Sequence, residues 1–292
     1  MPGAVTKARP GRPPLELEFG LRSDHEARAL AQAEALFNRG GRTARAAAIF
    51  RRYHSLEAQL GLAFTNWHGP TSLNAVQQIA GAHPNDPAAL LNLGWADYQA
   101  GRNADAAAAW RRVATRYPDS PYGVDAQDAL HGGPPGLPPI VTPLALPKAI
   151  ANLPAAAQIA ALKRAAAGTS VRAKLLYGTT LWNVLRTPIS AERQFAAAAR
   201  LAPQDAVVRA AAAVALFSKA NPTRAFSQLG PLTAVFPHSA AIQFHLGVLL
   251  LYIGENGKAG KHLRAAVVDG PRSLYAGPAR TLLASLAGTG SK

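Results

Sequence analysis

The sequence lacks cysteine: none of its 292 residues is Cys, and a single residue is Met. Disulfides, thiolate metal ligands, cysteine nucleophiles and acylated-cysteine anchors are therefore excluded. His238, His245 and His262 are spaced so that they could meet on one helix pair, but no nearby carboxylates complete a metal site. Glycine-rich phosphate loops, nucleophile elbows and the H-E-x-x-H pattern are also missing. We expect no metal, no cofactor and no catalytic residues.

Long hydrophobic runs are missing as well. The most apolar segment, Phe244–Ile253, is far shorter than the roughly 20 residues of a bilayer-spanning helix, and Gly247 interrupts it. The N-terminus has no apolar stretch of the kind found in secretory signal peptides. The sequence predicts a cytoplasmic protein without a membrane span, and a periplasmic or envelope location is the alternative.

Aromatic residues are few, at 7% of the chain, and no segment alternates apolar with polar residues as a half-buried strand does. What is abundant is alanine in stretches with helical periodicity, which favours closely packed helices. Hydrophobic residues make up 49% of the sequence, enough for a large buried core. The pattern predicts an all-α protein.

The most informative stretch runs from Asp86 to Pro118. Asp86 and Pro87 are typical of a helix start, Gly94 would allow a second helix to approach closely, and Gly101 would turn the chain. With Leu93, Ala106 and Trp110 at the matching offsets, the stretch resembles the tetratricopeptide repeat family. This resemblance implies a right-handed superhelical solenoid of antiparallel helix pairs.

Further copies of the same spacing occur along the chain. Leu60–Gly61 and Leu246–Gly247 anchor clear copies, and weaker ones centre on Tyr177 and Ala212. We therefore expect about five to six repeats in two blocks, each burying its apolar face on its neighbours. The residues assigned to packing between the helices are Leu60, Gly61, Leu93, Gly94, Gly101, Ala106, Trp110, Leu246, Gly247, Gly254 and Ala259.

Proline and glycine divide the chain. Residues 1–22 are predicted to be a disordered, basic, Pro/Gly-rich tail. Residues 132–147 contain too many prolines for a helix and predict an extended connector, whose apolar side chains could lie on the solenoid surface. The predicted organisation is a repeat block at 23–131, the connector at 132–147, a second block at 148–288 that ends in a capping helix over 273–287, and a short tail at 289–292.

Charge is distributed unevenly between the two halves. Residues 1–131 contain 14 Lys and Arg against 12 Asp and Glu, whereas residues 132–292 contain 17 against 4, which gives net charges of +2 and +13. A strongly basic second half indicates an acidic partner, a nucleic-acid backbone or anionic lipid. The alternative is that these cations simply solvate the outer helices.

In the resembled family, partners lie along a concave groove lined by the first helix of each pair. The resemblance implies that the corresponding positions of this sequence line such a groove. Several of these positions hold aromatic residues, which could anchor a bound peptide. Ordinary core packing is the alternative, and it is favoured for Phe217 and Phe244. The groove candidates are Trp95, Tyr98, Arg172, Thr179, Trp182, Asn183, Phe217, Phe244 and Tyr252.

The sequence therefore predicts a non-enzymatic scaffold that binds a protein or peptide segment, preferably an acidic one, and leaves the oligomeric state open. One alternative is a nucleic-acid-associated protein that uses the basic second block and the tail, where Gly11-Arg12-Pro13 is similar to minor-groove-binding hooks. A second alternative is an envelope-assembly protein, because Arg116–Tyr122 is similar to the inter-repeat turn of bacterial envelope tetratricopeptide proteins. Steep salt dependence of binding would favour the nucleic-acid alternative.

Overall fold

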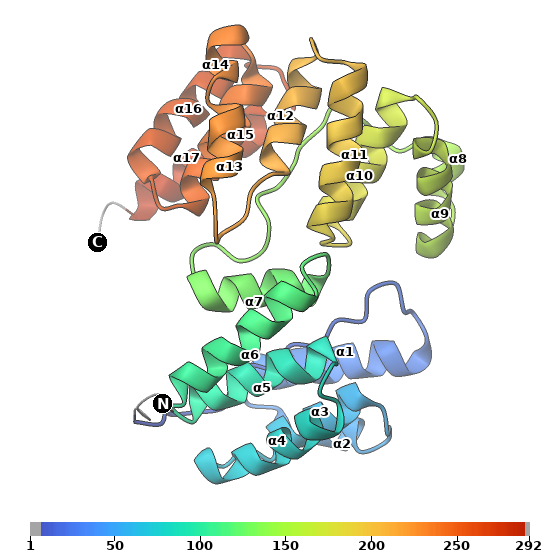
Figure 1. The fold of residues 1–292 in the computed structure, drawn as a ribbon, viewed down its shortest axis with the longest axis vertical. Helices are drawn as coiled ribbons and strands as arrows, with labels where there is room; N and C mark the ends of the chain where they lie inside the picture. Colours follow the sequence, from blue (N-terminus) through green and yellow to red (C-terminus); the bar gives the residue numbers. More distant parts are fainter. Residues whose placement is uncertain (1–6, 290–292) are drawn as a thin grey trace. The chain divides into compact units, whose positions relative to one another are not determined.

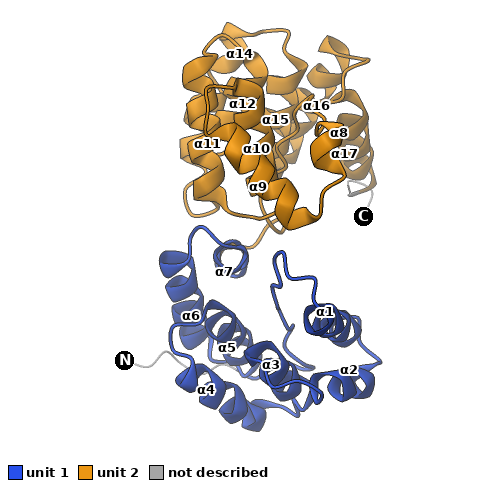
Figure 2. Cartoon of the chain, turned by 90° about the vertical axis from the view of Figure 1, so that its right-hand side faces the viewer, with its two compact units in different colours: residues 1–130 blue, residues 131–292 orange. Residues whose placement is uncertain are grey.

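The computed structural model describes residues 7–289, and every regular element in that range is a helix. The chain divides into two compact units, residues 1–130 (unit 1) and 131–292 (unit 2), which are coloured separately in Figure 2. Each unit is a stack of helix pairs, as the repeat spacing predicts. No helix in the described range is both long and apolar enough to cross a bilayer.

Unit 1 contains three helix pairs followed by a further helix (Figure 1). The first helix of each pair contacts the second along its length, and α5 and α6 form the longest pair. The elements are α1 (His25–Asn38), α2 (Thr43–Phe50), α3 (Leu56–Thr65), the 3-10 turn η1 (Pro70–Ser72), α4 (Leu73–Ala82), α5 (Pro87–Gln99), α6 (Asn103–Arg116) and α7 (Pro121–His131).

Unit 2 begins with two helices and continues with three pairs and a terminal helix, and one further four-residue helix lies between the second and third pairs. Its elements are α8 (Lys148–Ala151), α9 (Ala155–Ala166), α10 (Val171–Asn183), α11 (Pro188–Leu201), α12 (Ala206–Val214), α13 (Thr223–Leu229), α14 (Leu232–Val235), α15 (Ala240–Tyr252), α16 (Asn256–Asp269) and α17 (Ala276–Thr289). Helix α17 packs on α16, where the sequence predicts a capping helix. Its Pro278 lies in the first turn, where a missing N–H removes no intrahelical bond.

Side-chain caps mark the start of each pair. The first helices α1, α3, α5, α10, α12 and α15 each begin after a Ser or Asp whose side chain accepts a backbone N–H, whereas the second helices α2, α4, α6, α11, α13 and α16 have no such cap. Ser120 caps α7 in the same way, accepting from Gly123 N–H at 3.1 Å. The sequence Arg116–Tyr122 is therefore explained by an ordinary helix start, in which Ser120 is the N-cap of α7.

Glycines on the first helices hold the pairs together. A Cβ on Gly94 would overlap the Trp110 ring of α6, and one on Gly247 would lie 2.8 Å from Leu263 Cγ of α16. Gly61 differs, because the side chain that fills its space is Phe50 of the preceding helix α2. The second helix of this pair, α4, follows η1 and contains no aromatic residue that could fill the space beside Gly61.

Residues 7–22 correct the expectation of a disordered tail. Leu15 and Leu17 are 0% and 6% exposed and belong to the core of unit 1, together with Leu30, Phe37 and Phe64. Apolar side chains at alternate positions let this extended segment bury one face on the helices. Arg12 Nη1 donates to Thr43 Oγ1 at 2.7 Å, so the Gly-Arg-Pro sequence is docked and not a free hook. Residues 1–6 lie outside the described range.

Residues 132–147 contain no helix, but they are not a connector separate from the blocks. They belong to unit 2, and Figure 1 shows this segment in green along the helices of that unit before α8. Ile140 is 1% exposed in the core formed by α10 to α15, and Leu137 and Leu144 pack against the same core. The segment therefore completes the hydrophobic core of unit 2.

Candidate functional site

The groove of unit 2 holds residues 134–145 of the same chain as an extended peptide. Asn183, at the end of α10, grips both backbone groups of one residue: Ile140 N–H donates to Asn183 Oδ1 at 3.2 Å, and Asn183 Nδ2 donates to Ile140 O at 2.8 Å. We call this pairing the amide clamp. It recognises the peptide backbone and makes no demand on the side chain of the residue it holds.

Three more residues predicted to line the groove donate to carbonyl oxygens of this segment. Trp182 Nε1 donates to Pro138 O at 2.7 Å, Arg172 Nη2 to Ala145 O at 2.9 Å, and the Tyr252 hydroxyl to Leu137 O at 3.0 Å. Trp182 is also 1% exposed and part of the core. Four of the predicted groove residues, Asn183 included, therefore contact an extended peptide, and that peptide belongs to the chain itself.

His245 of α15 adds a contact that the sequence analysis missed. Val141 N–H donates to its Nε2 at 3.0 Å, and its Nδ1 lies 2.7 Å from Ala241 O. Because the first nitrogen accepts, the imidazole is neutral with its proton on Nδ1. Complete burial lowers the pKa of His245 to about 4. Lys219 is a second missed contact: its Nζ donates to Gly132 O and Pro134 O at 3.0 and 2.7 Å.

The three histidines considered above as possible metal ligands each contact another group of the protein. Both ring nitrogens of His245 face backbone groups, and His262 Nδ1 lies 2.7 Å from Gln243 Oε1. A carboxylate that the sequence analysis overlooked, Asp269, lies with its Oδ1 3.5 Å from His238 Nδ1. No group of three or more metal-ligating side chains gathers anywhere in residues 7–289.

The other groove candidates of unit 2 differ in burial: two are core residues and one is half-buried. Phe244 is 2% exposed and packs against Tyr275 with ring centroids 5.6 Å apart, so it is a core residue. Phe217 is nearly buried too, with its ring centroid 5.8 Å from that of Tyr252. Thr179 is half-buried on α10, and its Oγ1 has no hydrogen-bond partner among the described residues.

Unit 1 holds its own extended segment in the same manner. Asn92 of α5 accepts Glu16 N–H at 3.0 Å and donates to Glu16 O at 2.7 Å. Asn38 of α1 does the same for Leu15, at 3.0 and 2.7 Å. Three amide clamps, in two units, therefore bind extended backbone by the same geometry. Sequence reasoning missed Asn38 and Asn92, although an asparagine inside a helix is a poor helix former and thus a signal of such use.

Two further side chains of unit 1 also form hydrogen bonds with the backbone of this segment. Gln99 Nε2 donates to Pro10 O at 2.7 Å, and Leu17 N–H donates to Glu34 Oε1 at 2.8 Å. Burial, opposed by that hydrogen bond, raises the pKa of Glu34 to about 7. The predicted groove residue Tyr98 lies beneath the Arg9 guanidinium, whose Cζ is 3.5 Å from the ring centroid.

Trp95, the remaining candidate, packs mainly within its own helix pair. Its ring centroid lies 4.8 Å from that of Trp110 and 6.1 Å from that of Tyr98. Asp97, which stands where the family usually has a large aromatic residue, is 3% exposed and forms an ion pair with Arg102 at 3.3 Å. Burial raises the pKa of Asp97 to about 6.

The pair α5–α6 decides the family. Residues 88–120 match the sequence model of the tetratricopeptide repeat, and this range holds the glycine turn and the Gly94–Trp110 contact described above. The pair α5–α6 is a tetratricopeptide repeat. Gly101 has φ 82°, the left-handed conformation that the turn of the repeat requires.

Several solved structures have a distant likeness to this chain. Human IFIT1, in a dimer with PPP-AAAA, has 16% identity and a TM-score of 0.37 over 91% of this chain and 64% of its own. The TPR2AB domain of yeast Sti1, in a complex with pHSP90, has 11% identity and a TM-score of 0.34 over 90% and 98%. Yeast Tom70 has 10% identity and a TM-score of 0.35 over 90% and 48%. The chain thus spans less than two thirds of human IFIT1, and no curated protein matches its sequence.

Proposed function

We propose that this chain is a non-enzymatic scaffold that binds an extended segment of a protein partner in the groove of unit 2. The observation that carries the proposal is the amide clamp, in which Asn183 holds both backbone groups of Ile140. Hydrogen bonds to backbone groups do not select side chains, whereas the core contact of Ile140 requires an apolar one, so a partner segment with an apolar residue at that place can replace residues 134–145. Pro138 and its proline neighbours indicate that the preferred occupant is apolar and already extended.

We further propose that the partner is acidic around this segment. Residues 132–292 carry a net charge of +13, from 17 Lys and Arg against 4 Asp and Glu, while residues 134–145 contain no charged side chain. Arg172 and Lys219 contact carbonyl oxygens of the segment, and the remaining positive charge of unit 2 would speed the approach of an acidic protein. The groove would then hold the extended apolar part of that protein.

The test supplies the segment as a separate peptide. A tethered segment competes at an effective concentration on the order of millimolar, so it must first be weakened in the full chain by Ile140→Asp. A fluorescein-labelled peptide of residues 133–147 should bind the Ile140→Asp chain in anisotropy measurements and should not measurably bind the wild type. Adding Asn183→Ala should weaken binding about tenfold, because it removes two hydrogen bonds worth roughly 1.4 kcal/mol between them.

The control is the same peptide with Asp at the position of Ile140, which should not bind. Circular dichroism must show that the Ile140→Asp chain is folded, and Ile140→Ala replaces it if it is not. A folded variant that fails to bind the peptide, or binds a scrambled peptide equally well, would contradict the proposal. Asn183 suits this test better than Trp182, whose ring is part of the core.

A further inference from the structure

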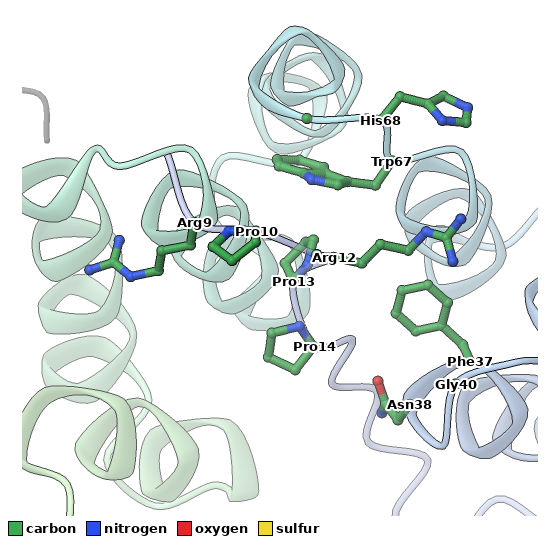
Figure 3. A pocket seen from close by; sticks show the side chains of 12 residues that line it. Arg9, Pro10, Arg12, Pro13, Pro14, Phe37, Asn38, Gly40, Trp67 and His68 are labelled. Carbon is green, nitrogen blue, oxygen red and sulfur yellow. The ribbon is translucent and has the colours of Figure 1, made fainter. Parts of the chain in front are cut away.

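Unit 1 contains an open cleft beside its extended segment, separate from the groove of unit 2. It lies between residues 9–14, the end of α1 and the loop after α3, and has a volume of about 810 Å³. Figure 3 shows the cleft, with Trp67 across from the prolines of the segment and Phe37 at one side. We call it the arginine–tryptophan cleft, and its main lining residues are Arg9, Pro10, Arg12, Phe37, Trp67 and His68.

Positive charge is concentrated at this cleft. Five cations line it or stand within two residues of a lining residue, namely Lys7, Arg9, Arg12, Arg39 and Arg42, and residues 7–14 and 37–45 contain no Asp or Glu. Among the described residues none of the five is in an ion pair, whereas Arg22 of the same unit pairs with Asp24 and Glu57. Without these five, residues 1–131 have 9 cations against 12 acids (14 minus 5, and 12). The cleft is therefore a basic site in an otherwise acidic unit.

A buried donor points to an acceptor in the ligand. Trp67 is 3% exposed, and its Nε1 has no hydrogen-bond partner within the described part of the chain. Figure 3 shows this nitrogen on the ring edge that faces the proline segment. An unpaired buried N–H is costly, so a carboxylate or carbonyl oxygen in the cleft would satisfy a group that the protein leaves open.

The aromatic side chains favour a peptide over a nucleic acid. Single-stranded nucleic acids are held by bases that stack on open ring faces. Phe37 and Trp67 are 6% and 3% exposed and offer no such face. The exposed apolar surface comes from the rings of Pro10 and Pro14, which suit an aliphatic side chain.

We propose that the arginine–tryptophan cleft is a docking site for an acidic segment of a partner protein. Carboxylates of that segment lie against Arg12, and an aliphatic side chain packs on Pro10 and Pro14. Arg9 is engaged with Asn103 and the Tyr98 ring and adds positive charge from the side. Arg12 already donates to Thr43 with one nitrogen, which fixes the guanidinium at the edge of the cleft and leaves further donors for a carboxylate.

The test uses three fluorescein-labelled probes with the full chain: a 12-residue peptide of Glu and Leu, its Lys and Leu counterpart, and a 12-nucleotide single-stranded DNA. The Glu/Leu peptide should bind and the Lys/Leu peptide should not. Arg12→Glu should weaken binding about fivefold or more, as expected for losing and reversing one exposed charge. Trp67→Phe, which removes the indole N–H, should also weaken it.

Arg111→Glu is the matched control, because Arg111 is an exposed arginine on α6, outside the residues that line the cleft. It should change the affinity less than twofold. Equal effects of Arg12→Glu and Arg111→Glu, or no binding of the acidic peptide, would overturn the proposal. Tighter binding of the DNA with the same dependence on Arg12 would overturn it in favour of a nucleic-acid site. Asn183→Ala should leave binding here unchanged, so failure at this cleft is distinguishable from failure of the unit 2 groove.

Discussion

At the scale of single residues, His245 joins the groove of unit 2 to its core. One nitrogen accepts Val141 N–H and the other faces Ala241 O, so the ring must stay neutral to keep both contacts. Tyr275 packs beside it, with ring centroids 5.8 Å apart, and burial raises the pKa of Tyr275 to about 12, so neither ring is charged at neutral pH. A proton on Nε2 would remove the acceptor for Val141.

His245 predicts a loss of stability in acid. The pKa is about 4 in the folded chain, against 6.5 for an ordinary histidine, so the unfolded chain binds the proton first. The neutral imidazole of His245 contributes fully to the free energy of unfolding above pH 6.5, and this contribution is lost as the pH falls towards 4. Between pH 7.5 and 5 we expect the free energy of unfolding to fall by about 2 kcal/mol from this group. Urea unfolding of the wild type and of His245→Gln checks this, since Gln does not titrate; parallel pH profiles would contradict it.

Glu34 should have the opposite effect in unit 1, so that its contribution to stability falls as the pH rises. Its pKa is raised to about 7 in the folded chain, so folding is opposed by ionisation as the pH rises from 4.5 through 7. Glu34→Gln keeps an oxygen for Leu17 N–H and removes the charge. We expect the variant to be more stable than the wild type by about 3 kcal/mol at pH 8 and nearly equal at pH 4.5. Urea unfolding at the two pH values measures this, and an equal difference at both would contradict it.

At the scale of elements, the helix pairs depend on local features that can be read from the sequence. The structure confirms three such features within one repeat. These are the helix start at Asp86 and Pro87, the close helix contact at Gly94 and the turn at Gly101. What the sequence could not predict are contacts between distant residues. Ile140 meets Asn183 across 43 positions and Glu16 meets Asn92 across 76, and no local pattern marks these pairings.

Glycine substitutions test the pair packing. In Gly94→Ala the new methyl group would overlap Trp110, so we expect a loss of about 1–3 kcal/mol in the free energy of unfolding. Gly81→Ala is the matched control, because Gly81 lies in α4 with open space around it. There alanine should stabilise the helix by up to about 1 kcal/mol. Thermal unfolding of both variants measures the contrast, and equal shifts would show that the close contact at Gly94 is unimportant.

At the scale of the whole molecule, each unit has its own hydrophobic core and its own extended segment. Leu15 and Leu17 complete one core, and Ile140 completes the other. The sequence predicted two blocks of helices but treated both proline-rich segments as lying outside them. Their composition does exclude helices and strand pairs, yet it does not exclude burial, because the polar side chains of the helices supply the missing hydrogen bonds.

Leu15 tests whether residues 7–22 are part of unit 1. Leu15→Ala should lower the free energy of unfolding of this unit by about 2–4 kcal/mol, as for other fully buried leucines. Leu21→Ala, at a position 41% exposed, should have little effect. Hydrogen exchange should speed up in α1 to α6 of the Leu15→Ala chain and remain unchanged in α10 to α16. Similar exchange in both variants would mean that the segment does not stabilise the unit.

The prolines in the segment of unit 2 have a consequence for solubility. Prolines at 134, 135, 138, 139, 143 and 147 leave few backbone N–H groups along this stretch. A strand with few donors is a poor template for sheet growth. If a partner displaces this segment, the prolines should therefore oppose pairing of the freed chain into sheets, while the displacement uncovers the core that Ile140 completes.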